Sequence, residues 1–292
     1  MSEHGAYRPR LKTEFDRLYD LDDPGPYFTA LAPTEYRMPA VLARALEVIH
    51  RPLCTARDAG RTLRIVDFAC GYGVIGALLR HDVSMAEIYA WYGERQWRPG
   101  DGRRYWEADK AFFGARRAAA ATFEIGGIDV AGTALAYAET LGFIDRSFHE
   151  NLLESAPSDE FSRFLRRADL VVESGALGPL LPGAFGRILD HADDARRPWF
   201  LYQLRPDVEG AALRGLWAAR GYRMEDLGAG PIRYRKPLGE GERAEMLHNT
   251  RALGKPDAAV MQGGYLLVDV TLARPEAAAD DPPIARLQIK DD

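Results

Sequence analysis

The chain has 292 residues, of which 47% are hydrophobic and 28% are charged. This is the composition of an ordinary globular protein, and it argues against extended disorder. With 38 basic against 43 acidic residues the formal net charge is −5, and the arginine pairs are scattered among acids. We therefore expect no nucleic-acid partner.

The sequence also gives no support for a membrane-spanning protein or for a metal-binding protein. No apolar run approaches the roughly 20 residues of a membrane-spanning helix, and the polar first residues lack a signal-peptide pattern. The two cysteines, Cys54 and Cys70, are too few for a disulfide framework, and the six histidines show no metal-ligand spacing. We expect a reduced, cytoplasmic protein without a membrane partner or a metal site.

Helical patterns come first along the chain, at residues 10–19 and 39–50, and we expect residues 1–60 to form a helical N-terminal cap. Short apolar segments then alternate with helical patterns. The spacing predicts strands at 62–69, 122–129, 168–173, 199–204, 222–227 and 264–272, and helices at 74–91, 105–121, 132–142, 182–192 and 210–220.

Such alternation predicts a Rossmann-like α/β fold, a mostly parallel sheet with helices on both faces. Ligands of such sheets bind beyond the carboxyl ends of the strands. The loops after residues 69, 129 and 173 are therefore the first places to look for a site. The last 19 residues, 274–292, are rich in proline, alanine and acids and are expected to be a frayed tail.

A glycine-rich turn joins the first strand to its helix: Asp67-Phe68-Ala69-Cys70-Gly71-Tyr72-Gly73-Val74-Ile75-Gly76. Small residues there let a ligand lie against bare backbone, and the helix start offers free N–H groups. The three glycines also match the dinucleotide motif G-x-G-x-x-G. However, the next strand-terminal acid, Asp129, comes about 60 positions later, where that motif needs about 20. A nicotinamide enzyme is therefore disfavoured.

Residues 67–73 resemble motif I of the class I S-adenosylmethionine-dependent methyltransferases, acid-x-Gly-x-Gly-x-Gly, with Ala69 in place of the first glycine. Asp129 ends the next strand and resembles the motif II acid, which holds both ribose hydroxyls. Asn151 stands where the family places a polar residue against the adenine amino group. Residues 169–173 resemble motif IV.

This resemblance covers roughly residues 60–273 and implies a seven-stranded sheet with an antiparallel last strand. It implies S-adenosylmethionine as cofactor. An acid near the motif I turn also suits the positive charges of that cofactor. With Tyr27 of the N-terminal link added, the expected cofactor-binding residues are Asp67, Ala69, Cys70, Gly71, Tyr72, Gly73, Asp129, Val130, Asn151, Leu152, Glu173 and Tyr27.

Three domains follow: the cap at 1–60, a methyltransferase-like core at 61–273, and the tail at 274–292. The core departs from the family by insertions at about 93–121 and 240–261. Such additions usually carry substrate specificity in this family, so its common substrates cannot be carried over. Residues 240–247 predict a solvated amphipathic helix or a homodimer contact.

Three residues are candidates for catalysis. Glu173 could accept a proton or merely cap the following turn, and His149 could be a general base or a surface residue. Tyr36, like Tyr27, lies beside prolines and is expected to line the pocket. The aromatic residues of the first insertion could form a lid over the site or pack that insertion onto the sheet: Trp91, Tyr92, Trp97, Tyr105 and Trp106.

Methyl transfer to a small molecule is the favoured function. One alternative is cleavage of the same cofactor, by cyclisation or aminocarboxypropyl transfer, with release of methylthioadenosine. Another is a non-catalytic protein that binds the cofactor. The sequence shows no unambiguous base, which suits methylation by proximity and leaves the acceptor open.

Overall fold

The computed structural model describes residues 7, 16–57, 62–95, 102–118, 123–176, 178–228, 230–278 and 284. Most of the helix predicted at 10–19, Trp97 and most of the predicted tail lie outside these residues. None of the described helices is both long and apolar enough to cross a membrane.

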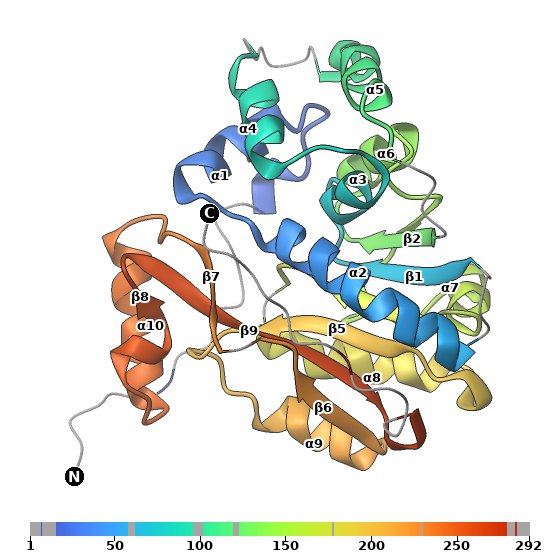
Figure 1. The fold of residues 1–292 in the computed structure, drawn as a ribbon, viewed down its shortest axis with the longest axis vertical. Coiled ribbons are helices and arrows are strands. Elements are labelled where there is room, and N and C mark those ends of the chain that lie inside the picture. Colours follow the sequence, from blue (N-terminus) through green and yellow to red (C-terminus); the bar gives the residue numbers. More distant parts are fainter. Residues whose placement is uncertain are drawn as a thin grey trace.

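A nine-stranded sheet forms the centre, with seven strands in the order β3-β2-β1-β4-β5-β9-β6 (Figure 1). The first five of this order are parallel to one another, and β9 is antiparallel to both of its neighbours. The bounds are β1 Leu63–Phe68, β2 Phe123–Asp129, β3 Arg146–His149, β4 Leu170–Glu173, β5 Trp199–Leu204, β6 Tyr222–Asp226 and β9 Tyr265–Pro275. The predicted Rossmann-like, mostly parallel sheet with an antiparallel last strand is confirmed.

The predicted count of seven strands is wrong, because β9 is longer than its place between β5 and β6 requires. Its residues 269–273 pair with β5, whereas residues 265–268 project further and pair with β7 (Ile232–Arg235) and β8 (Met261–Gln262). β9 also continues to Pro275, so the first residues of the predicted tail belong to the sheet.

Helices cover both faces of the sheet, as predicted. Alternate strand residues enter two separate cores: Ile65 packs in the first and Val66 in the second. The helices of the first face are α2 (Met38–Arg57), α3 (Val74–Arg80) and α6 (Gly132–Thr140). Those of the second are α7 (Asp159–Leu165), α8 (Leu181–His191) and α9 (Ala211–Ala219) (Figure 1). Thus α2, placed in the cap by the sequence, is a layer helix of the core.

The helix predicted at 74–91 is two helices, α3 and α4 (Met85–Gly93). The chain becomes extended at His81, and a new helix starts at Ser84. The Ser84 Oγ accepts a hydrogen bond from the Glu87 backbone N–H, and the Glu87 carboxylate accepts one from the Ser84 N–H. This capping box supplies the partners that a helix start otherwise lacks.

The N-terminal segment and the first insertion pack together through a buried carboxylate. The segment contains η1 (Asp16–Leu18), α1 (Gly25–Leu31) and η2 (Ala32–Thr34), and α1 packs against α4. The insertion contains η3 (Gly102–Tyr105) and α5 (Trp106–Gly114). Asp109 is fully buried and accepts hydrogen bonds from Trp91 Nε1 at 2.8 Å and from the Tyr137 hydroxyl at 3.0 Å. Arg95 bridges Asp109 to Asp23.

The second insertion contains α10 (Glu240–Ala252) and η6 (Asp257–Ala259), followed by β8. It lies with β7 at one end of the molecule, on the opposite side from α7 (Figure 1). The helix predicted at 240–247 is therefore present and longer. Three short 3-10 turns complete the described elements: η4 Gly178–Leu180, η5 Asp194–Arg196 and η7 Glu276–Ala278.

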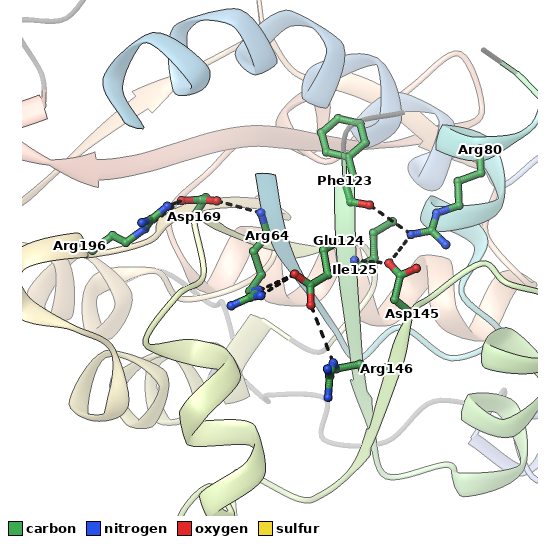
Figure 2. A network of polar contacts seen from close by, with 9 residues as sticks. All are labelled: Arg64, Arg80, Phe123, Glu124, Ile125, Asp145, Arg146, Asp169 and Arg196. Carbon is green, nitrogen blue, oxygen red and sulfur yellow. Dashed lines mark hydrogen bonds and ion pairs between the residues drawn. The ribbon is translucent and has the colours of Figure 1, made fainter. Parts of the chain in front are cut away.

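Charged side chains join the amino-terminal ends of neighbouring strands through ion pairs and hydrogen bonds (Figure 2). Arg64 at the start of β1 binds Glu124 of β2, with Nε at 2.9 Å. Asp169, just before β4, accepts from the Arg64 backbone N–H at 2.8 Å and from Arg196 at 2.9 Å. Asp145 accepts from the Ile125 N–H at 2.7 Å. The opposite, carboxyl edge is where the remaining polar groups of the strand ends gather.

Candidate functional site

A cavity of about 620 Å³ lies at the carboxyl ends of β1, β2, β4 and β5. Its size falls within the range of small-molecule sites. The loops after the strands form its floor, and the N-terminal segment and β7 form its walls. Of the residues predicted from the sequence, those that line it are Tyr27, Tyr36, Ala69, Cys70, Asp129, Val130, Asn151 and Leu152.

The glycine turn has the backbone shape that only small residues tolerate. Gly71 and Gly73 have φ of 51° and 72°, in the left-handed region. A Cβ on Gly71 would lie 2.5 Å from Tyr19 Cε1, and one on Gly76 would lie 2.0 Å from the Phe143 carbonyl oxygen. The glycines thus let the N-terminal segment sit on the turn and let α3 pack against the loop before β3.

Ala69 adopts φ of 55°, a conformation that a non-glycine residue rarely takes. For an L-residue this conformation costs about 1–2 kcal/mol.

We expect Ala69→Gly to raise the free energy of unfolding by about 0.5–1 kcal/mol, because the relieved strain exceeds the extra entropy of glycine in the unfolded chain. Urea denaturation monitored by circular dichroism measures the change. A variant less stable than the wild type would show that the left-handed residue carries no strain.

Asp129 ties the two loops of the site together. One carboxylate oxygen accepts from the Gly71 N–H at 2.8 Å, and the other accepts from the Ala131 N–H at 2.9 Å. Burial raises the pKa of this carboxyl, and the backbone hydrogen bonds oppose that rise. A carboxylate so fixed at the edge of a cavity presents its remaining lone pairs to a ligand.

Asp67 is a buried carboxylate whose two oxygens have no hydrogen-bond partner among the described residues. Asp67 is the last but one residue of β1, just before the glycine turn, and it does not itself line the cavity. Burial raises its pKa well above the usual value, and the nearby charges of Asp129 and Glu173 raise it further. A cation placed beside it would remove this penalty.

The β2 and β3 ends contribute apolar side chains that are unusually exposed. Val130 is 62% exposed and Leu153 is 41% exposed, and both line the cavity with Leu152. Asn151 accepts a hydrogen bond from the Leu153 N–H at 3.0 Å, which fixes the loop. Exposed apolar side chains at a cavity mouth are suited to covering a flat ring.

Tyrosines of the N-terminal segment close the other side. Tyr19 and Tyr27 have ring centroids 4.9 Å apart, and both line the cavity. The Tyr36 hydroxyl donates to the Ser174 carbonyl at the end of β4. Tyr72 does not line the cavity; its hydroxyl shares its one proton between the carbonyls of Leu18 at 2.6 Å and Leu21 at 2.9 Å and so docks the segment onto the turn.

Tyr72→Phe is expected to loosen this segment. The two buried carbonyl bonds are lost, which lowers the free energy of unfolding by about 1–2 kcal/mol. Hydrogen exchange followed by mass spectrometry should show faster exchange for peptides covering residues 16–31, with the sheet unchanged. Equal exchange in variant and wild type would contradict a docking role.

Two predicted catalytic residues do not meet the cavity. Glu173 is fully buried, and one of its oxygens accepts from the backbone N–H groups of Gly175 and Ala176. It therefore caps its own turn, and burial raises its pKa to about 7. His149 lies over Gly132, with Nε2 2.9 Å from the Val130 carbonyl oxygen, on the outer side of the β2 loop. Side-chain direction, which the sequence does not show, separates both residues from the site.

The sequence left two alternatives for the aromatic residues of the first insertion, a lid over the site or packing onto the sheet, and those that the structure describes do not line the cavity. Trp91 stacks on Phe112 with ring centroids 4.4 Å apart, and Trp106 Nε1 donates to the Asp22 carbonyl at 2.8 Å. The Tyr92 hydroxyl pairs with that of Tyr137. These rings pack the insertion onto the core.

The predicted residues Gly71 and Gly73 shape the turn without lining the cavity.

The lining residues that the sequence did not predict include four polar or aromatic ones at the β5 and β7 end: Gln203, Arg205, Tyr234 and Arg235. Gln203 and Arg205 lie at the carboxyl end of the strand predicted at 199–204, and the strand-end rule that identified Asp129 could have found them. Tyr234 and Arg235 belong to β7, a strand of four residues without a strong pattern.

No family model matches the chain, and no curated protein matches it. Among solved structures, it is similar to the [4+2]-cyclase SpnF, with 14% identity over 94% of this chain and 99% of that chain and a TM-score of 0.44. It is also similar to the plantazolicin methyltransferase BpumL in complex with SAH, with 10% identity, coverage of 82% and 85%, and a TM-score of 0.40. A TehB-like SAM-dependent methyltransferase from Corynebacterium glutamicum shows 16% identity, coverage of 80% and 96%, and a TM-score of 0.36.

Proposed function

We propose that the cavity binds S-adenosylmethionine and that the protein transfers its methyl group to a small molecule. The observation that carries the proposal is the convergence of three different groups at one sheet edge. They are a glycine turn, a strand-end carboxylate fixed by two backbone N–H groups, and a buried carboxylate without a partner. Each suits a different part of this cofactor.

The residues fit the group. Asp129 suits the vicinal ribose hydroxyls, because a carboxylate can accept two hydrogen bonds at once. Asp67 does not line the cavity, but its buried carboxyl suits a positively charged methionine end held against the nearby lining residues Ala69 and Cys70, since a cation there would compensate its burial. Val130 and Leu152, with Asn151 at the edge, suit the adenine ring. When bound, the cofactor supplies an activated methyl group on sulfur.

The chain's own contribution to such a reaction is positional. The Tyr27 and Tyr36 side chains wall the cavity and exclude water, which aligns an acceptor with the methyl group and desolvates it. Neither Glu173 nor His149 faces the cavity, so no assigned base takes the acceptor's proton. The acceptor's proton therefore passes to bulk solvent as the methylated product leaves the cavity, and most of the rate advantage comes from proximity.

The test is incubation of the protein with S-adenosylmethionine, alone and with a mixture of candidate acceptors, followed by mass spectrometry of the nucleosides. We expect the cofactor to persist when it is alone and to be converted into S-adenosylhomocysteine when an acceptor is present. Methylthioadenosine formed without any acceptor would establish cleavage or cyclisation instead. Binding without turnover under every condition would establish a non-catalytic protein.

A further inference from the structure

The second half of the cavity lies between the end of β5 and the added strand β7, away from Asp129. Gln203 and Tyr234 line it and are 7% and 4% exposed. The Gln203 Oε1 and the Tyr234 hydroxyl are buried and find no hydrogen-bond partner within the described part of the chain. Leaving such groups unsatisfied is costly, so two of them at one cavity indicate a ligand that satisfies both.

Charged groups at the same end are already matched in pairs. Arg205 binds both carboxylate oxygens of Asp207, at 3.0 and 3.1 Å. Arg235 binds both carboxylate oxygens of Glu242 on α10, each at 2.7 Å. Bidentate pairs of this kind satisfy a guanidinium and a carboxylate together. The arrangement therefore favours a ligand without charge at this end.

Ring walls complete this end of the cavity. Tyr36 and Tyr234 meet edge to face, with ring centroids 6.4 Å apart and an interplanar angle of 80°. Gly175 and Leu180, after β4, also line the cavity. These surfaces suit the apolar body of a planar molecule.

We propose that this end is the acceptor subsite and that it takes a neutral, planar molecule bearing a phenol-type or enol-type hydroxyl. The carbonyl of Gln203 can only accept a hydrogen bond, whereas the Tyr234 hydroxyl can donate one. A hydroxyl on the ligand donates to the first and accepts from the second, which pairs both buried groups. As an acceptor subsite the assignment rests on the proposed function; as a binding site it can be tested separately.

The probes are 2-naphthol, 2-methoxynaphthalene and 2-naphthoate, which share a ring system. 2-Naphthol presents a hydroxyl, 2-methoxynaphthalene presents a methoxy group that cannot donate a hydrogen bond, and 2-naphthoate presents a charged carboxylate. Each is titrated into the full chain by fluorescence, with and without saturating S-adenosylhomocysteine. We expect 2-naphthol to bind about tenfold or more tightly than either comparator, since each comparator leaves Gln203 unpaired. Equal binding of the three, or tighter binding of 2-naphthoate, would overturn the proposal.

Two cavity variants and one control variant distinguish a loss of ligand recognition from a loss of folding stability. Tyr234→Phe and Gln203→Leu should each weaken 2-naphthol about tenfold. Gln203→Leu should leave 2-methoxynaphthalene unchanged, whereas Tyr234→Phe should weaken it too, because the ether oxygen accepts from the Tyr234 hydroxyl. The melting temperature of Tyr234→Phe should not fall, because the hydroxyl has no partner to lose within the described chain. Tyr222→Phe is the matched control: its hydroxyl donates to the Pro198 carbonyl at 2.8 Å, so it should lower the melting temperature without affecting the probe. Unchanged discrimination in both cavity variants would also overturn the proposal.

Calorimetric titration of S-adenosylhomocysteine on the same samples distinguishes the two proposals. If 2-naphthol is selected but S-adenosylhomocysteine does not bind, the hydroxyl site stands and the proposed cofactor fails. If S-adenosylhomocysteine binds but the three probes do not differ, the cofactor site stands and the acceptor class is wrong.

Discussion

Asp129→Ala is expected to weaken the binding of S-adenosylhomocysteine about a hundredfold. The proposed role of Asp129 is to accept hydrogen bonds from both ribose hydroxyls, and each bond to a charged group contributes about 1.5–3 kcal/mol. Loss of about 2.7 kcal/mol corresponds to a factor of one hundred in the dissociation constant. Isothermal titration calorimetry measures it directly.

Controls must separate this effect from loss of structure, because Asp129 also holds the N–H groups of Gly71 and Ala131. Asp145→Ala is the match at the opposite edge: Asp145 accepts from the Ile125 N–H and binds Arg80. It should lower the melting temperature and leave binding unchanged. Asp129→Asn, which keeps one acceptor oxygen, should fall between wild type and alanine. Binding by Asp129→Ala within about twofold of the wild type would exclude the assigned role.

Asp67→Asn is expected to raise the stability of the ligand-free protein by about 1–3 kcal/mol above neutral pH, because it removes a buried carboxylate without a partner. The pKa of Asp67 is raised well above its usual value in the folded chain, by burial first. At pH values between the usual carboxyl pKa of the unfolded chain and the raised pKa of the folded chain, the folded state therefore binds more protons than the unfolded state. The free energy of unfolding therefore falls as pH rises through this interval.

The dependence of the free energy of unfolding on pH tests this account of Asp67. The advantage of Asp67→Asn should disappear below the usual carboxyl pKa, near pH 4, and grow as the pH rises. Asp169→Asn is the matched control, since Asp169 is equally buried but bound to Arg64 N and Arg196. That change should destabilise the protein. Chemical denaturation at several pH values measures both.

The same variant should also bind S-adenosylhomocysteine more weakly, because the ligand's ammonium loses its counter-charge. In the wild type, a cation beside Asp67 lowers the pKa of that carboxyl, so binding should release a proton. The calorimetric enthalpy then depends on the ionisation enthalpy of the buffer, and this dependence should be smaller in Asp67→Asn. A variant that is less stable at every pH and binds like the wild type would refute the account of Asp67.

Much of the fold follows from local pattern. The strands that became β1, β2, β4 and β5 are short, apolar and bounded by turn residues, and the structure places them as predicted. Three strands escaped prediction for physical reasons. Only Phe148 is buried among the four residues of β3, and β7 and β8 exist because β9 projects far enough to pair with them. The break between α3 and α4 depends on the Ser84 cap rather than on hydrophobic spacing.

Chain position alone brings some of the predicted residues to the cavity: Asp129, Val130 and Asn151 lie at or after strand ends and line it. Side-chain direction, which the sequence does not show, decides for others: Glu173 also ends a strand, but its carboxylate turns back to its own loop. Gln203 and Tyr234 could not be paired from the sequence, because their strands β5 and β7 are connected only through long-range pairing with β9.

The central claim, that the cavity binds S-adenosylmethionine, is tested most directly by calorimetric titration of the wild-type protein with this compound. We expect one molecule to bind per chain, with a dissociation constant in the micromolar range and with loss of that binding in Asp129→Ala. Absence of binding at millimolar S-adenosylmethionine, in a sample whose melting curve shows folded protein, would contradict the account.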